Sequence, residues 1–158
     1  MQKITPFLWF DDQAEAAAAL YTSLFDDSEI TEVTRYPEGG PGEAGAVMTV
    51  SFRLAGQEFT ALNGGPLFPF TEAVSFHVHC QDQGEVDRFW SQLIDGGGEE
   101  SQCGWLKDRF GLSWQIVPDR LNELLADPDP ARAQAAMQAM LQMSKIDIKV
   151  VEDAADAA

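Results

Sequence analysis

The first part of the chain alternates short apolar runs with one helical segment. Residues 4–10 form an apolar and aromatic run whose length predicts a buried strand. Residues 14–25 are rich in alanine and carry apolar side chains at helical spacing, which predicts a helix capped by Asp11-Asp12. Further strands are predicted at residues 29–36, 46–54 and 57–63, the first two separated by a Gly/Pro loop.

The same order of elements is predicted a second time. The pattern indicates a strand at residues 73–80, a helix at 83–95, one or two short strands within 99–106 and a last strand at 112–117. Asp12-Gln13-x-Glu15 recurs as Asp82-Gln83-x-Glu85, so the chain contains an internal repeat. Each repeat has the order βαβββ. We therefore predict an α+β fold in which two modules form a curved mixed sheet with a cleft and with the helices outside.

The repeat sets the expected boundaries. Residues 1–158 form one domain, with module 1 at residues 3–65, module 2 at 72–118 and a C-terminal appendage at 119–150. Asp129-Pro130 predicts the start of a helix that ends near residue 143. Ile146, Ile148 and Val150 alternate with charged residues and predict an edge strand, and residues 152–158 are expected to fray.

Composition and charge narrow the partners. The chain has 26 acidic and 10 basic side chains and a net charge of −16, which argues against a protein that binds nucleic acid or anionic lipid. No apolar run is long enough to span a membrane, and no signal peptide is recognisable. The two cysteines, Cys80 and Cys103, are too few for a disulfide framework, so a cytoplasmic location is expected.

Several motifs together resemble one branch of a known superfamily. They are ITPFLWFDDQAE at residues 4–15, LNGGP at 62–66, CGWLKD at 103–108 and GLSWQIVP at 111–118. These motifs and the paired βαβββ units resemble the vicinal oxygen chelate superfamily, which includes glyoxalase I, extradiol dioxygenases and bleomycin-resistance proteins. Within it they are similar to the PhnB-like branch described as 3-demethylubiquinone-9 3-methyltransferase. The resemblance covers residues 3–150 and implies a homodimer.

The resemblance also implies where metal ligands would stand. Metal-dependent members carry four ligands, which correspond here to positions near Pro6, Thr60, Ser75 and Gln115. None of these offers a carboxylate, imidazole or thiolate, so no metal or other cofactor is expected. The alternative is a zinc or iron site formed by His77 and His79, two apart on one strand, with Gln115 as a weak third ligand.

The expected ligand is a small organic molecule, apolar or aromatic, held in the cleft between the modules. The candidate cleft residues are Thr60, His77, His79, Cys103, Trp105 and Gln115. If the protein is an enzyme, which the sequence leaves open, His77 or His79 is the candidate general base because histidine titrates near neutral pH. The alternatives are a sequestration protein of the bleomycin-resistance type and the 3-demethylubiquinone-9 3-methyltransferase that the branch description names. The glycine clusters at residues 39–40, 64–65 and 96–98 lack the strand–turn–helix setting that binds S-adenosylmethionine.

Overall fold

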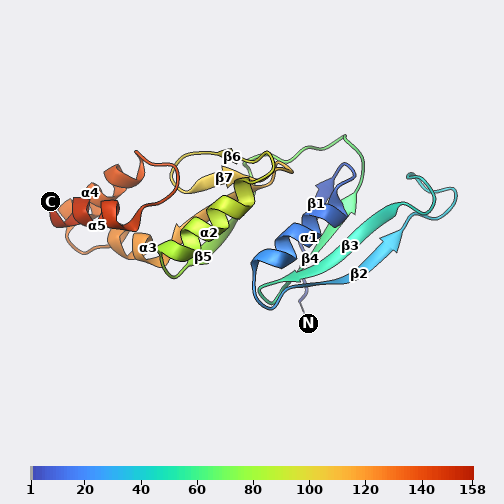
Figure 1. Cartoon of the computed structure of the whole chain (residues 1–158), viewed down its shortest axis with the longest axis horizontal. Coiled ribbons are helices and arrows are strands. Elements are labelled where there is room, and N and C mark those ends of the chain that lie inside the picture. Colours follow the sequence, from blue (N-terminus) through green and yellow to red (C-terminus); the bar gives the residue numbers. More distant parts are fainter. Residues whose placement is uncertain (1) are drawn as a thin grey trace. The chain divides into compact units, whose positions relative to one another are not determined.

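The computed structural model describes residues 2–158, which divide into two compact units, unit 1 ending at Phe70 and unit 2 spanning Thr71–Ala158 (Figure 1). Unit 1 contains β1 (Phe7–Phe10), α1 (Ala14–Leu24), β2 (Glu29–Arg35), β3 (Val47–Leu54) and β4 (Gln57–Asn63). Its sheet has the strand order β1-β4-β3-β2, in which β1 runs parallel to β4 and the other pairs are antiparallel.

Unit 2 repeats this topology and adds three helices. It contains β5 (Ser75–Cys80), α2 (Gln83–Ile94), β6 (Glu99–Glu100), β7 (Trp105–Lys107) and β8 (Ser113–Pro118), followed by α3 (Asp119–Leu125), α4 (Pro130–Met140) and α5 (Ile148–Asp156). The strand order β5-β8-β7-β6 matches unit 1, with β5 parallel to β8. The α+β class, the two βαβββ modules and the helical C-terminal appendage are thus confirmed.

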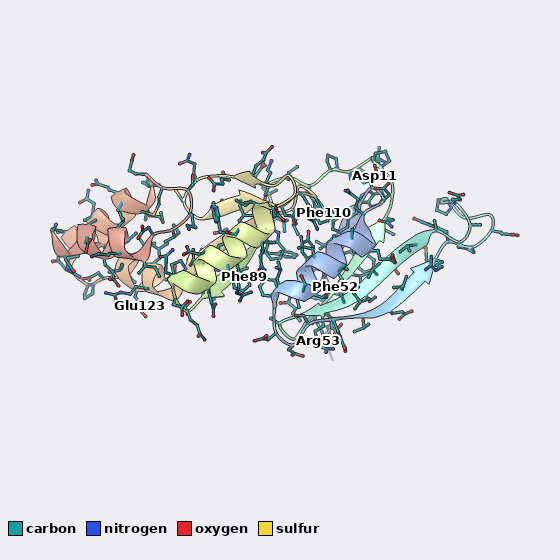
Figure 2. The ribbon with its side chains drawn as sticks, viewed as in Figure 1. Asp11, Phe52, Arg53, Phe89, Phe110 and Glu123 are labelled. Carbon is teal, nitrogen blue, oxygen red and sulfur yellow. The ribbon has the colours of Figure 1, made fainter. Side chains whose placement is uncertain are left out.

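One face of each sheet is packed under its helix. In unit 1, alternate residues of β3 such as Val50 and Phe52 are fully buried, and the Phe52 ring lies 6.3 Å from the ring of Tyr21 in α1 (Figure 2). In unit 2, Trp114 and Ile116 of β8 are buried on the side where α2 packs. Burying alternate residues on one side leaves the residues between them for the opposite face, which no helix of the βαβββ motif covers.

The two equivalent helices begin differently. Asp82 caps α2, because its side chain accepts a hydrogen bond from the Glu85 N–H at 2.9 Å. The expected cap of α1 by Asp11-Asp12 is wrong. The first N–H of α1, from Ala14, donates instead to Oδ1 of Asn63 at 2.8 Å. A strand residue 49 positions away thus replaces the local cap.

The C-terminal prediction also needs correction. Residues 148–156 form α5 instead of an edge strand and a frayed tail. Asp147 caps this helix at the Val150 N–H, and Val151 and Ala155 are fully buried one turn apart. They belong to a small core of α3, α4 and α5 whose members are Val117, Leu121, Leu124, Ala136, Ile146, Val151 and Ala155. Within residues 2–158, every helix is too short or too polar to cross a bilayer.

Candidate functional site

The face of the unit 2 sheet opposite α2 carries a row of polar side chains. Ser75, His77 and His79 alternate along β5 and therefore point to the same side. The parallel register pairs His77 with Gln115 of β8, and the antiparallel register pairs Gln115 with Trp105 of β7. Four of the predicted residues, His77, His79, Gln115 and Trp105, thus share one face, which we call the histidine face.

Hydrogen bonds order part of this face. The Gln115 amide nitrogen donates to the Ser75 hydroxyl at 2.9 Å, which fixes the amide plane beside His77. The rings of His77 and His79 lie edge to face with their centroids 4.6 Å apart. His79 Nδ1 lies 3.4 Å from a carboxylate oxygen of Asp119, the first residue of α3. Asp119 was not among the predicted site residues, since no spacing in the sequence links it to β5.

The surroundings of His77 favour its neutral form. Partial burial, followed by repulsion from a protonated His79, lowers the pKa of His77 below 6.5, although Asp119 opposes the shift. At neutral pH the imidazole therefore has a free nitrogen lone pair. Such a ring accepts a hydrogen bond or a proton from a bound molecule.

The opposite face of the same strands is structural. Trp114, next to Gln115, points into the core, and its indole nitrogen donates to Asp108 at 3.0 Å. Asp108 stands in the charged run Lys107-Asp108-Arg109, which by sequence alone would be expected in an exposed corner, and the structure contradicts this. Its side chain is buried and also accepts hydrogen bonds from the N–H groups of Phe110 and Leu112. Asp108 therefore holds the turn before β8 in place.

The two cysteines lie outside the strand positions that form the histidine face. Cys103 precedes β7 in a turn, at φ = +57°, and its N–H donates to the Met143 carbonyl of the segment after α4. Among residues 2–158, no hydrogen bond or ion pair joins its thiol to His77 or His79, so nothing in this part of the chain pairs Cys103 with either histidine as nucleophile and base. Cys80 is fully buried, and burial raises the pKa of its thiol to about 12, which keeps it protonated.

Thr60 lies in unit 1 at the position equivalent to Gln115. It pairs with Phe7 of β1 just as Gln115 pairs with His77 of β5. The four equivalent positions set by the register are therefore Phe7, Thr60, His77 and Gln115, which shifts the first-strand positions from the expected Pro6 and Ser75. Thr60 is 8% exposed, so it offers a ligand little surface.

The alternative metal site offers few ligand atoms. Two imidazoles and one amide are the only nitrogen or oxygen donors of the alternative metal site at His77, His79 and Gln115. In residues 2–158, no three histidine, cysteine, aspartate or glutamate side chains gather closely enough to hold a metal ion. Zinc and iron sites normally have at least three such ligands.

The glycine clusters do not fit S-adenosylmethionine. Gly64 and Gly65 follow β4, yet the next element is a linker, and a Cβ on Gly64 would come within 2.4 Å of the Trp9 ring. Gly39 and Gly40 lie in the β2–β3 loop, and the third cluster follows α2. In residues 2–158, none of these clusters joins a parallel strand to a helix, as the usual nucleotide-binding turn does.

Comparisons with known proteins identify relatives. The family model described as 3-demethylubiquinone-9 3-methyltransferase matches residues 2–117. The chain is similar to a Bacillus cereus PhnB protein that is provisionally given the same description, with 40% identity and a TM-score of 0.68, over 74% of this chain and 99% of that one. No curated protein matches significantly.

Two more distant structures share the fold. One is a protein from Pseudomonas aeruginosa, with 18% identity and a TM-score of 0.61 over 75% of this chain and 98% of that one. The other is a genomically encoded fosfomycin resistance protein from Listeria monocytogenes, with 16% identity and a TM-score of 0.51 over 75% and 93%. At these identities the likeness concerns architecture alone.

Proposed function

Because the chain belongs to the family described as 3-demethylubiquinone-9 3-methyltransferase, in the vicinal oxygen chelate superfamily, we propose that it binds a small organic molecule through its histidine face. The observation that carries the proposal is the pairing of His77 with Gln115 at the strand position equivalent to Phe7 and Thr60 in unit 1. At this pair of positions, unit 1 has an apolar ring and a hydroxyl group, whereas unit 2 has an imidazole and an amide.

The side chains define the kind of ligand that would fit. The face of Trp105 suits a planar or apolar body, since it neighbours Gln115 across β7 and β8. Gln115 is oriented by Ser75 and has a further N–H to donate to a carbonyl or hydroxyl oxygen. A quinone or a thiol conjugate, which combines an apolar body with such oxygens, is the class we propose.

His77 is the proposed base if the bound molecule reacts. Its neutral ring accepts a proton from an acidic C–H or O–H group of the ligand, and the imidazolium then returns the proton to product or solvent. The negative charge of Asp119 favours the positive charge on His77, whereas repulsion from His79 opposes it. A ligand that binds and is recovered unchanged would instead mean sequestration, the alternative function.

The test is a thermal-shift screen of quinones and thiol conjugates, followed by titration of the best compound by calorimetry. We expect His77→Gln and Gln115→Ala to weaken binding at least tenfold. Gln81→Ala, an exposed polar residue just beyond β5, is the matched control and should change affinity less than twofold. Equal affinity in all three variants would refute the assignment to the histidine face.

The family description favours a second candidate, methyl transfer from S-adenosylmethionine. Because the glycine clusters do not fit this cofactor, we derive no step through it. The candidate predicts stoichiometric calorimetric binding of S-adenosylmethionine, and methyl transfer to a demethylated quinol. We expect neither, and micromolar binding with transfer would overturn that expectation.

A further inference from the structure

A pocket lies in unit 1, at the end of its sheet beside the start of α1. It has a volume of about 650 Å³ and is lined by parts of β1, α1, the β2–β3 loop and the end of β4. This volume suits a drug-sized molecule. We call it the unit 1 pocket; its lining residues all belong to unit 1 and none of them is part of the histidine face.

Two aromatic rings with fixed orientations line the pocket. The Trp9 indole nitrogen donates to the Gly65 carbonyl at 2.8 Å, and the Tyr36 hydroxyl donates to the Asn63 carbonyl. Gly42 packs closely against the Tyr36 ring, since a Cβ on Gly42 would come within 2.5 Å of it. The Trp9 ring also packs edge to face with Phe68, at a centroid distance of 5.0 Å. With their polar atoms engaged, the two rings therefore offer a ligand only their remaining π surface and apolar edges.

The other neutral polar group of the lining is also engaged. The Asn63 amide accepts from the Ala14 N–H at 2.8 Å and donates to the Val47 carbonyl at 3.1 Å. Met48 and Leu62 add apolar surface. Apart from main-chain atoms, what remains for a ligand is therefore aromatic and aliphatic surface together with the charged groups of the lining.

Those charged groups are all carboxylates. Asp11 and Asp12 follow β1, where Figure 2 shows Asp11 beyond the end of the strand, and Glu15 lies in the first turn of α1. In residues 2–158, no lysine or arginine forms an ion pair with any of the three. Arg35, the basic residue beside Tyr36 in sequence, donates to the Gly45 carbonyl and is not part of the lining.

The helix start does not account for these charges. A helix N-terminus carries about half a positive charge, against three negative ones here. Neither Asp11 nor Asp12 caps α1, because the cap residue is Gln13 and Asn63 takes the Ala14 N–H. The pocket therefore combines π surface with a net negative field, which attracts organic cations and repels phosphates and carboxylates.

We infer that the unit 1 pocket binds hydrophobic organic cations, meaning onium ions or protonated amines with an aromatic or branched body. Tetraphenylphosphonium and tetraphenylborate test this directly, because they share shape and apolar surface but carry opposite charge. In sodium buffer at 0.1 M salt, calorimetry should detect one bound tetraphenylphosphonium per chain and no binding of tetraphenylborate. Equal binding of the two ions would overturn the inference.

Variants separate a local site from the general acidity of the chain. Neutralising the pocket carboxylates in Asp11→Asn/Asp12→Asn/Glu15→Gln should weaken tetraphenylphosphonium binding at least tenfold. Asp26→Asn/Glu32→Gln/Glu58→Gln removes the same charge outside the lining and should weaken it less than twofold. Equal weakening in both would mean nonspecific attraction and would overturn the site.

Three further measurements test the position of the site and the folding of the variants. Glu15→Lys changes a single exposed helical residue, should fold as the parent does and should abolish binding. In ¹H–¹⁵N spectra, tetraphenylphosphonium should shift the indole N–H signal of Trp9 and leave that of Trp105 unchanged. A shift of the Trp105 signal without one of the Trp9 signal would refute binding in the unit 1 pocket. His77→Gln should leave this binding intact, so failure here is distinguishable from failure of the function proposed for the histidine face.

Discussion

The titration of His77 depends on two neighbours that act in opposite directions. Repulsion from His79 lowers the pKa of His77 and attraction to Asp119 raises it, while burial lowers it most. We therefore expect the His77 Hε1 resonance to titrate below the ordinary pH of about 6.5. His79→Gln should move the midpoint up and Asp119→Asn should move it down. Shifts of the same sign in both variants would contradict this geometry.

The same shift links the stability of the fold to pH. A lowered pKa in the folded chain means that the unfolded chain binds the proton more tightly. The contribution of His77 to the free energy of unfolding is therefore complete above about pH 7 and is lost as pH falls through the folded pKa. Denaturant unfolding at pH 7 and pH 5 should show a smaller pH dependence for His77→Gln than for the parent.

Asp108 is expected to matter for stability instead of chemistry. Asp108→Ala would leave the Trp114 indole N–H and the N–H groups of Phe110 and Leu112 buried without these acceptors. A loss of about 3 kcal/mol is expected, since each unsatisfied buried donor costs roughly 1–3 kcal/mol. Urea unfolding measures this, with Asp153→Ala as an exposed control. A loss below about 1 kcal/mol would contradict the structural role.

For single residues, the sequence predicts which face of a strand a side chain points to better than it predicts how buried that side chain is or what it contacts. Alternation along a strand placed His77, His79 and Ser75 on one face and Trp114 on the other, as the structure has them. The burial of Asp108 depends on acceptor geometry within a turn, which a charged run such as Lys107-Asp108-Arg109 does not reveal. Asp119 near His79 and the unit 1 pocket likewise arise from tertiary contacts.

Among the elements, α5 provides a matched pair of substitutions. Val151 is fully buried in the core of α3, α4 and α5, whereas its neighbour Val150 is 48% exposed. Val151→Ala should lower the free energy of unfolding by about 2 kcal/mol, through lost burial and a residual cavity. Val150→Ala should change it by less than about 0.5 kcal/mol. Thermal and urea unfolding of both variants test the register of the helix, and a larger loss for Val150→Ala than for Val151→Ala would argue for the strand that the sequence suggests.

The error at this segment has a physical cause. Ile146, Ile148 and Val150 alternate with charged residues over five positions, and so short a run satisfies a strand pattern. The structure follows a second pattern, Val151 and Ala155 at helical spacing after the Asp147 cap. Alanine carries little hydrophobic signal, so only the packing surface of α3 and α4 selects the helix. The larger elements of the repeat have longer patterns and were predicted correctly.

For the whole molecule, the dominant property is surplus negative charge. Sixteen more acidic than basic side chains remain after every lysine and arginine is counted, and the ion pairs of residues 2–158 are largely exposed. Exposed pairs contribute little, whereas repulsion among surplus carboxylates favours expansion of the chain. The repeat determines the topology, but this charge determines how the fold responds to its solvent.

Salt should therefore stabilise this protein. Raising NaCl from 10 mM to 200 mM shortens the Debye length from about 30 Å to below 8 Å and screens the repulsion more than the contact pairs. We expect Tm to rise by roughly 3 °C, which corresponds to about 1 kcal/mol at this chain length. Asp26→Asn/Glu32→Gln/Glu58→Gln removes three surplus charges and should show a smaller rise. A fall in Tm with salt would mean that the ion pairs, such as those of Arg53 with Asp27 and Glu29, outweigh the repulsion.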